Sequence, residues 1–331
     1  MKFLVCGVGS VGERHIRNLL ELGYKDILLY RRSDLPLRTI KDTFATYTSI
    51  DKALLEKPDV ALITNPTSLH MPVALRCAEA GCHLFMEKPI SNNLEGTSKL
   101  KSIVNEKNLT VFVGFQFRFH PGIIKIKQLL NERTIGDVVC VHAHWGEYLP
   151  DWHPWEDYQN SYSAREDLGG GVILTLCHPI DYVQWLFGEI TSVSAIAGSL
   201  SGLSVSVEDV ADVLLQFKSN IIGYIHLDYV QRPKSHWLQI TGCKGRIKWD
   251  NDDGIVRLYK ADSECREDFP LPDGFERNTM FVNEMQHFIG CVQDREKLLV
   301  DLSDGIKTVK VVLATKQSIS ERRMVFIASD N

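Results

Sequence analysis

The sequence lacks the features that mark an exported, membrane-spanning or nucleic-acid-binding protein. Its apolar runs are shorter than the ~18 residues that a membrane span requires. The short apolar stretch that follows Met1 has no small-residue cleavage site after it. No long basic tract is present, and the formal net charge of −5 gives no attraction to nucleic acid or to an anionic membrane. We therefore expect a cytoplasmic protein that binds neither of them.

Cysteine pairs with metal-binding or redox spacing are also absent. None of the eight cysteines forms a C-x-x-C pair, and they are scattered along a chain in which we recognise no export signal. We expect buried or surface thiols rather than a disulfide framework, at Cys6, Cys77, Cys82, Cys140, Cys177, Cys243, Cys265 and Cys291.

One other spacing could hold zinc. Cys140, His142 and His144 alternate on one face of a predicted strand, and His153 could supply a fourth ligand. The opposite face of that strand is apolar and is therefore the packed side, with Val139, Val141, Ala143 and Trp145. We expect no metal, and we place the histidines on an open sheet face toward the substrate or a partner subunit.

The first 120 residues alternate β-rich runs with amphipathic helical stretches. Strands are expected at residues 2–6, 26–30, 60–64, 83–87 and 110–114, and helices at 11–22, 49–55, 71–80 and 94–106. Strands that alternate with helices are joined by right-handed crossovers and form a parallel sheet. The fold class is therefore α/β, beginning with an N-terminal Rossmann-type, doubly wound parallel sheet over residues 1–120.

The pattern changes after residue 120. Strands are expected at residues 138–148, 192–198, 210–217, 221–229, 236–241, 246–250 and 254–258, and helices at 123–131, 170–187, 279–294 and 302–322. Consecutive strands joined by short turns form antiparallel sheets. We expect a second, α+β domain over residues 121–331, with a large, mainly antiparallel, open-faced sheet.

Glycines with a characteristic spacing lie between the first predicted strand and the first helix. Gly7 allows a tight turn, Gly9 lets the backbone approach a pyrophosphate, and Gly12 lets the helix pack close to the strand. Ser10 and Val11 begin the helix, whose free N–H groups favour phosphate. This turn, in this context, predicts a bound dinucleotide.

The end of the second predicted strand indicates which dinucleotide is bound. A carboxylate there would bind a free ribose 2′-hydroxyl, but this chain has Arg31, Arg32 and Ser33. Two guanidinium groups and a hydroxyl suit a 2′-phosphate. We therefore expect NADP as the preferred cofactor, with NAD as the alternative and Asp34 as its ribose ligand.

Several further motifs occur in a consistent order along the chain. They are residues 64–70 (TNPTSLH), 87–89 (EKP), 114–119 (GFQFRF), 169–171 (GGG) and 178–181 (HPID). With the glycine turn they extend over nearly the whole chain, which resembles the glucose–fructose oxidoreductase/inositol dehydrogenase/MocA (Gfo/Idh/MocA) family.

The resemblance implies hydride transfer between NAD(P) and a secondary carbinol or ketone of a sugar, cyclitol or nucleotide sugar. It places Thr64, Asn65 and His70 beside the adenosine and pyrophosphate, and Glu87 and Lys88 at the nicotinamide end. The bond between Lys88 and the following proline is commonly cis in similar proteins.

Oxidation of a carbinol also needs a base for the hydroxyl proton, and Lys88 and His178 are the candidates. An imidazole titrates near neutral pH, and burial can lower the pKa of a lysine. We expect Lys88 to hydrogen-bond the reacting oxygen while His178 moves the proton. Similar proteins place a carboxylate shortly before this histidine, where this chain has Leu174 and Thr175. His178 would then depend on Thr175 or on water for its orientation. Asp181, one helical turn further on, is the alternative to the missing carboxylate, although the resemblance to similar proteins implies a structural role for it.

We expect the substrate pocket to combine aromatic faces, planar polar groups and arginines, which suit a sugar ring bearing a carboxylate or phosphate. The candidates are Gln116, Arg118, Trp152, Tyr158, Tyr162, Arg165 and Thr175. Residues 156–165 resemble proteins of bacterial surface-polysaccharide and sialic-acid-like sugar pathways, which favours a nucleotide sugar or an acidic sugar.

The alternatives to a sugar oxidoreductase are a dehydrogenase of non-sugar carbonyls or diols, and a non-catalytic NAD(P)-sensing regulatory protein. We expect a homodimer or homotetramer formed through the C-terminal sheet.

Overall fold

The computed structural model describes residues 1–32 and 37–328, which form two compact units. The first unit comprises Met1–Gln116 and Glu276–Val309, and the second comprises Phe117–Phe275 with the residues from Lys310 onward. The sequence analysis expected one boundary, after residue 120, whereas this division places residues 117–120 in the second unit and Glu276–Val309 in the first. Within the described ranges, no helix combines the length and the apolar character needed to cross a bilayer.

The first unit contains a six-stranded parallel sheet in the order β3-β2-β1-β4-β5-β6. Its strands are β1 (Phe3–Cys6), β2 (Ile27–Tyr30), β3 (Ala45–Tyr47), β4 (Val60–Ile63), β5 (His83–Met86) and β6 (Val111–Val113). Every residue of β1 and β4 is buried, as expected for parallel strands that are covered on both faces. The predicted Rossmann-type sheet is confirmed, although the short, largely exposed strand β3 was missed.

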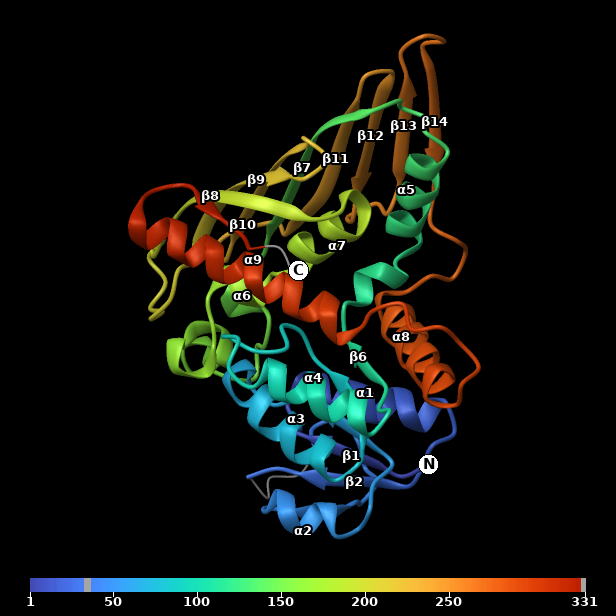
Figure 1. The fold of residues 1–331 in the computed structure, drawn as a ribbon, viewed down its shortest axis with the longest axis vertical. Helices are drawn as coiled ribbons and strands as arrows, with labels where there is room; N and C mark the ends of the chain where they lie inside the picture. Colours follow the sequence, from blue (N-terminus) through green and yellow to red (C-terminus); the bar gives the residue numbers. More distant parts are fainter. Residues whose placement is uncertain (33–36, 329–331) are drawn as a thin grey trace. The chain divides into compact units, whose positions relative to one another are not determined.

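Helices of the first unit cover this sheet. They are α1 (Ser10–Glu21), α2 (Ile50–Leu54), α3 (His70–Glu79), α4 (Thr97–Glu106) and α8 (Arg277–Val292), with α3 and α4 lying side by side (Figure 1). The Phe85 ring on β5 lies 5.2 Å from Phe112 on β6 and 5.5 Å from Phe288 on α8. This aromatic packing explains why α8, late in the sequence, belongs to the first unit.

The second unit contains a nine-stranded sheet in the order β14-β13-β12-β11-β7-β10-β9-β8-β15. Among the described strands of this sheet, only β7 and β10 pair in parallel, so the prediction of a mainly antiparallel sheet is confirmed. Its strands are β7 (Val138–Gly146), β8 (Ile190–Gly198), β9 (Val210–Phe217), β10 (Ile222–Asp228), β11 (Ser235–Gly242), β12 (Gly245–Asp250), β13 (Val256–Lys260), β14 (Cys265–Phe269) and β15 (Val325–Phe326).

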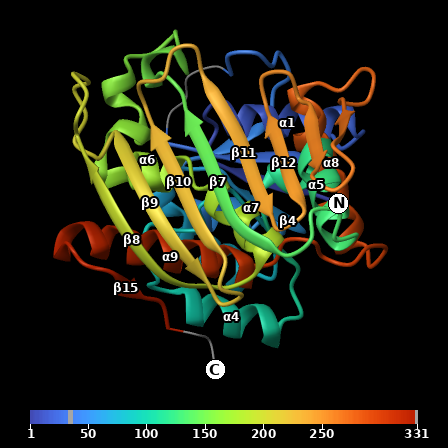
Figure 2. The same ribbon diagram turned by 90° about the horizontal axis from the view of Figure 1, so that it is seen from above.

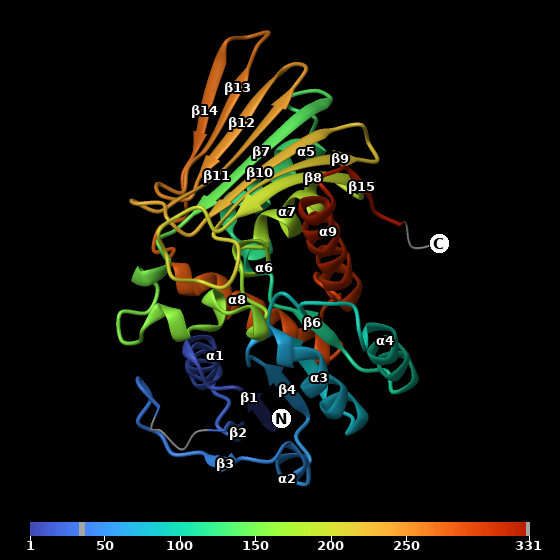
Figure 3. The same cartoon turned by 90° about the vertical axis from the view of Figure 1, so that its left-hand side faces the viewer.

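One face of this sheet is packed and the other is open. Helices α5 (Pro121–Asn131) and α7 (His178–Phe187) lie against the packed face, and Figure 2 looks onto the open one. Figure 3 shows the strands side by side from β14 to β15. Burial alternates along β9, which agrees with a strand that is packed on one side only.

The prediction of one helix over residues 170–187 is wrong. The chain forms a short helix α6 (Val172–Thr175), breaks at Leu176 and Cys177, and starts again as α7. Pro179, in the first turn of α7, has no N–H to donate to the carbonyl of Thr175, and its ring would collide with that carbonyl in a continuous helix. His178 is therefore the first residue of a helix and does not lie in the interior of one.

The last helix, α9 (Leu302–Glu321), contributes residues to both units. Strands β14 and β15 were also missed by the sequence analysis. Strand β14 has the charged sequence CREDF, and β15 has only two residues, so neither carries a clear apolar alternation.

Candidate functional site

The glycine turn after β1 has the geometry that its spacing predicts. Gly7 has a φ of 99°, and a Cβ there would lie 2.6 Å from the Asn65 backbone. A Cβ on Gly12 would lie 2.2 Å from the Gly7 carbonyl oxygen. At Gly9, by contrast, a Cβ would meet no described atom within 4 Å. Packing therefore leaves no room for a side chain at Gly7 or Gly12, whereas there is open space beside the backbone of Gly9.

The N-terminus of α1 borders this open space. Gly9 is the N-cap residue and has no side chain with which to cap the first N–H groups, at Ser10 and Val11 among others. The Thr64 hydroxyl donates to the Gly7 carbonyl at 2.6 Å and so fixes the turn from the end of β4. A helix N-terminus beside a glycine turn binds phosphate groups well.

Asn65 and His70 continue the site from the end of β4. The Asn65 side-chain nitrogen and oxygen are both buried and have no hydrogen-bond partner among the described residues. His70 Nε2 lies 2.6 Å from the Asn65 carbonyl oxygen, and its Nδ1 lies 2.8 Å from the Pro89 carbonyl oxygen. Burial lowers the pKa of His70 although both carbonyls favour the protonated ring. An amide without a partner beside an open glycine turn fits the polar groups of a dinucleotide.

The arginines that suggest NADP lie at the end of β2. Arg31 is half-buried, its backbone N–H donates to the Tyr47 carbonyl at 3.0 Å, and Arg32 is exposed. Ser33 and Asp34 lie outside the described residues. The two arginines therefore directly follow the second strand of the sheet, as the sequence predicts.

The Glu-Lys-Pro motif follows β5, and its Lys88–Pro89 peptide bond is cis, as predicted. Glu87 is buried, and its Oε2 accepts a hydrogen bond from the Lys88 backbone N–H at 3.3 Å. The Lys88 side chain is half-buried. The Glu87 carboxylate thus holds the backbone of the residue that is expected to contact the reacting oxygen.

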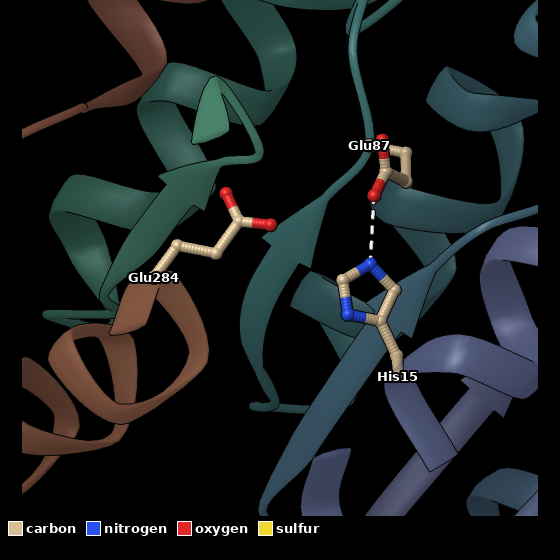
Figure 4. A group of neighbouring side chains, drawn as sticks. All are labelled: His15, Glu87 and Glu284. Carbon is tan, nitrogen blue, oxygen red and sulfur yellow. Dashed lines mark hydrogen bonds and ion pairs between the residues drawn. The ribbon is translucent and has the colours of Figure 1, made fainter. Parts of the chain in front are cut away.

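Glu87 also belongs to a buried group of three ionisable side chains, shown in Figure 4. His15 Nε2 on α1 lies 2.7 Å from Glu87 Oε1, and one carboxyl oxygen of Glu284 on α8 completes a set of atoms that all lie within 4.8 Å of one another. Among the residues described, this is the one group of three with metal-ligand atoms this close. The sequence analysis missed His15 and Glu284. The position of His15, one helical turn after Gly12, was the available signal.

These carboxyls have pKa values that move in opposite directions. Burial raises the pKa of Glu87, but the hydrogen bond and charge of His15, with the charges of Lys88 and His70, leave it lowered. Burial, reinforced by the charge of Glu87, raises the pKa of Glu284 well above its usual range, and Arg14 opposes this only in part. The two environments favour a charged Glu87 and a neutral Glu284.

In the second unit, His178 lies among aromatic rings. It is 1% exposed, and its ring centroid lies 5.1 Å from that of Phe117 and 5.4 Å from that of Trp145. Trp145 stacks in turn on His236 at 4.2 Å. The packed face of β7 therefore carries the indole against which His178 is held.

Arg118 and Asp181 form a buried ion pair. Arg118 donates from Nη2 to Asp181 Oδ1 at 2.7 Å and from Nε to Oδ2 at 3.1 Å. Both side chains are almost fully buried, so the pair ties the segment before α5 to α7. In this structure the Arg118 guanidinium is directed at the Asp181 carboxylate.

Most of the other predicted substrate residues lie in one loop of the second unit. Trp152 packs edge-on against Tyr229 at 5.5 Å, and the Tyr158 hydroxyl accepts from the Ser204 N–H at 3.2 Å. Tyr162 is half-buried, Thr175 is buried, and Gln116 is a buried residue at the end of the first unit's opening segment. Arg165 is exposed and pairs with Asp167 at 2.7 Å, which raises the pKa of Arg165. Trp152, Tyr158, Tyr162 and Arg165 all belong to one loop of the second unit.

The open sheet face carries Cys140, His142 and His144, as expected from their alternation. His144 stacks on His226 at 5.0 Å and on Trp237 at 5.4 Å. His226 Nδ1 lies 2.7 Å from Asp212, and its Nε2 lies 3.2 Å from Asp228. Histidine and aspartate side chains thus form a polar row across this face.

Two family models match the chain. Residues 1–115 match the oxidoreductase family with an NAD-binding Rossmann fold, and residues 123–248 match the GFO/IDH/MocA C-terminal domain. Together they cover most of the chain and both units.

Individual relatives agree with this assignment. Myo-inositol 2-dehydrogenase of Thermotoga maritima is 28% identical over 349 residues, with 98% of each chain covered. Levoglucosan dehydrogenase in complex with NADH and levoglucosan has a TM-score of 0.86 at 17% identity, with 99% of each chain covered. The WlbA dehydrogenase of Bordetella pertussis, in complex with NADH and UDP-GlcNAcA, has a TM-score of 0.83 at 18% identity, with 100% of this chain and 99% of the other covered.

The dinucleotide prediction, the fold and the order of motifs therefore point to one family. The chain belongs to the Gfo/Idh/MocA family and is an NAD-binding oxidoreductase.

Proposed function

We propose that this protein transfers a hydride between NAD(P) and a secondary carbinol or ketone of a sugar, cyclitol or nucleotide sugar. The observation that carries the proposal is the open glycine turn with the partnerless Asn65 amide, in the same unit as a half-buried Lys88. The bound nicotinamide supplies or accepts the hydride, which protein side chains do not do. The names of relatives that act on myo-inositol and levoglucosan support the sugar class.

Within this proposal, Lys88 and His178 handle the hydroxyl proton. Lys88 donates a hydrogen bond to the reacting oxygen and stabilises the negative charge that develops there. His178 takes the proton in oxidation and returns it in reduction, because an imidazole can both accept and donate near neutral pH. The stacking of His178 on Trp145 supports the role by limiting the orientations of the ring.

The decisive experiment is a substrate screen that follows absorbance of the reduced nicotinamide. The panel contains inositols, anhydrosugars, acidic sugars and UDP- or CMP-sugars, each with NAD and with NADP. We expect turnover with at least one polyol or sugar. Tight cofactor binding with no turnover on the whole panel would contradict the proposal and favour a cofactor-sensing protein, whereas turnover on simple diols alone would favour a non-sugar dehydrogenase.

We also propose that NADP is preferred over NAD. Support comes from Arg31 and Arg32 at the end of β2, since guanidinium groups bind a 2′-phosphate with charge-assisted hydrogen bonds. Replacement of Arg31 by Asp should weaken NADPH binding by about tenfold or more and leave NADH binding less affected. Titration of both cofactors into wild type and R31D, with exposed Arg322→Asp as the charge-matched control, tests this. NADH binding as tight as NADPH in the wild type would contradict the preference.

The loop of the second unit is proposed to bind the substrate ring. Trp152, Tyr158 and Tyr162 offer aromatic faces, Gln116 and Thr175 offer polar groups, and the guanidinium groups of Arg118 and Arg165 suit an acidic substituent. Arg165 is the better candidate of the two arginines because its partner Asp167 is exposed and exchangeable. R165Q should raise the KM for acidic sugars and leave the KM for neutral sugars unchanged; an equal effect on both would exclude the role.

Finally, we propose that copies of the chain associate through the open sheet face into a dimer or tetramer. Large apolar side chains on that face are strongly exposed, with Ile196 at 79%, Ile222 at 60% and Leu214 at 52%. Their register on β8, β9 and β10 places them on the same side as His142 and His144. Exposed apolar side chains on one face are typical of an association surface. Leu214→Asp should shift the sedimentation of the wild type toward the monomer; a monomeric wild type would refute the proposal.

A further inference from the structure

Glu284 is a buried carboxyl that has no role in the chemistry proposed above. It lies on α8 and is 0% exposed. Neither of its oxygens has a hydrogen-bond partner among the described residues. In Figure 4 its carboxyl is directed toward the side where His15 and Glu87 form their hydrogen bond. A carboxyl in these surroundings needs a physical explanation, because buried polar groups are almost always hydrogen-bonded.

The neighbouring charges disfavour an ionised Glu284. The Glu87 carboxylate is the nearest acidic group, with an oxygen within 4.8 Å of one on Glu284. Two buried carboxylates this close cannot both be ionised without strong repulsion. Positive charges act on the cluster from His15 and Arg14 on α1 and, on Glu87, from Lys88 and His70. The positive charge of Arg14 is attracted by both carboxyls and repelled by Arg277 on α8.

The bonds of Glu87 show which carboxyl carries the charge. Glu87 has a hydrogen bond with His15 at 2.7 Å and accepts one from the Lys88 backbone N–H at 3.3 Å. An ionised carboxylate accepts both bonds well, whereas a protonated one loses acceptor capacity. None of the residues that the structure describes donates a hydrogen bond to Glu284. The negative charge therefore belongs on Glu87.

We propose that Glu284 holds a proton in the resting protein and limits the buried cluster to a single negative charge, on Glu87, which then fixes the backbone of Lys88. Glu284 is in this sense a positioning residue that acts on Lys88 through Glu87. The inference about Lys88 rests on the proposed function, whereas the protonation of Glu284 does not.

The proposal has a consequence for stability that needs no substrate. Burial first, and then the charge of Glu87, raise the pKa of Glu284 in the folded protein above its value in the unfolded chain. The folded state therefore binds the extra proton. The resulting stabilisation is fully present below the unfolded pKa and is lost as the pH rises through the folded pKa. Arg14, His15, Lys88 and His70 face the cluster and limit the size of the effect.

The first experiment compares wild type with Glu284→Gln, which keeps the shape and removes the titration. Denaturant unfolding of the full-length protein is measured from about pH 6 to about pH 9 in buffer with a chelator. We expect the stability of E284Q relative to wild type to increase toward alkaline pH. Exposed Glu106→Gln, also in the first unit, is the matched control and should follow the wild-type profile. An E284Q profile that is parallel to wild type would overturn the proposal.

Infrared spectroscopy of the wild type provides a test that does not depend on a variant folding well. At neutral pH we expect the C=O band of a protonated carboxyl in a buried site, and its absence would overturn the proposal. The same band should be missing in E284Q. Elemental analysis tests the alternative that His15, Glu87 and Glu284 ligate a divalent cation. A stoichiometric metal that wild type retains and E284Q loses would also overturn the proposal.

The link to Lys88 is tested by the pH profile of turnover on whichever substrate the screen identifies. Ionisation of Glu284 should weaken the hold of Glu87 on Lys88, so kcat of the wild type should fall at alkaline pH and E284Q should extend the active range upward. KM for the cofactor should change little. If no substrate is turned over, the proposed function fails, while the unfolding and infrared results still decide the protonation of Glu284.

Discussion

Lys88 in the first unit and His178 in the second, the two residues proposed to handle one proton, have opposite surroundings. Lys88 follows a buried carboxylate that is bonded to His15 and has Glu284 nearby. His178 is packed between the rings of Phe117 and Trp145. The position of Lys88 therefore depends on neighbouring charges, and that of His178 depends on ring packing. Substitutions that change charge should act on Lys88, and substitutions that change packing should act on His178.

The largest effect is expected from removing the two groups themselves. Lys88→Met and His178→Asn should each lower kcat by roughly 10²–10⁴-fold, the usual contribution of a positioned acid or base. Because neither change touches the glycine turn, cofactor binding measured by fluorescence titration should remain. A loss of cofactor binding equal to the loss of kcat would show that the residue binds the dinucleotide and does not act in proton transfer.

A second effect concerns the buried ion pair of the second unit. Asp181→Asn leaves the Arg118 guanidinium buried without a full counter-charge, and breaking such a pair costs about 3–5 kcal/mol of unfolding free energy. Chemical denaturation measures the loss. The exposed pair of Arg133 and Asp137 is the control, since Asp137→Asn should cost at most about 1 kcal/mol. Equal, small losses for both would mean that Arg118 is held by other contacts.

The third effect concerns the charge on Glu87. Burial raises the pKa of Glu87, but the hydrogen bond and charge of His15, with the charges of Lys88 and His70, leave its folded pKa lowered. A lowered pKa contributes stability that is present above the unfolded value and is lost as the pH falls through the folded value. Glu87→Gln should therefore reduce stability at neutral pH by about 1–3 kcal/mol, as expected for a hydrogen bond to a charged group, and by less at acid pH. Unfolding at several pH values tests this, and a loss that does not depend on pH would mean that Glu87 is already protonated.

The contrast between the two units also explains which features could be predicted from the sequence. The glycine spacing of residues 7–12 is a local signal for a turn between a strand and a helix, so the turn was predictable, whereas the cis bond after Lys88 was implied by the resemblance to the family. Glu284 lies almost at the other end of the chain from His15, and a single sequence contains no signal that joins α8 to α1. The cluster could therefore be found only in the structure.

The second unit shows the same limit in its packing. The alternation along β7 correctly separated the face of Trp145 from that of His142 and His144, but Val139, which was expected on the packed face, is exposed. It could not show that Trp145 stacks on His178 and His236, because those contacts join α7 and β11 to β7. Nor could helical periodicity reveal the break before His178. The Pro179 signal was present there, but the apolar pattern on both sides of it favoured a continuous helix.

The smallest effect is expected at His226 on the open face of the second unit, where charge rather than packing contributes to stability. The hydrogen bond with Asp228 raises the pKa of His226 against the opposing effect of burial, and Asp212 adds to the increase. A raised folded pKa contributes stability that is fully present below the unfolded value, about 6.5, and is lost as the pH rises through the folded value. His226→Gln should therefore cost less than about 1 kcal/mol near pH 6, because the pair is only partly buried, and almost nothing near pH 9. Exposed His142→Gln on the same face is the control, and unfolding at two protein concentrations separates this effect from association. A larger loss at pH 9 than at pH 6 would mean that His226 is neutral in the folded protein. Packing, and not its charge, would then account for the contribution of His226 to stability.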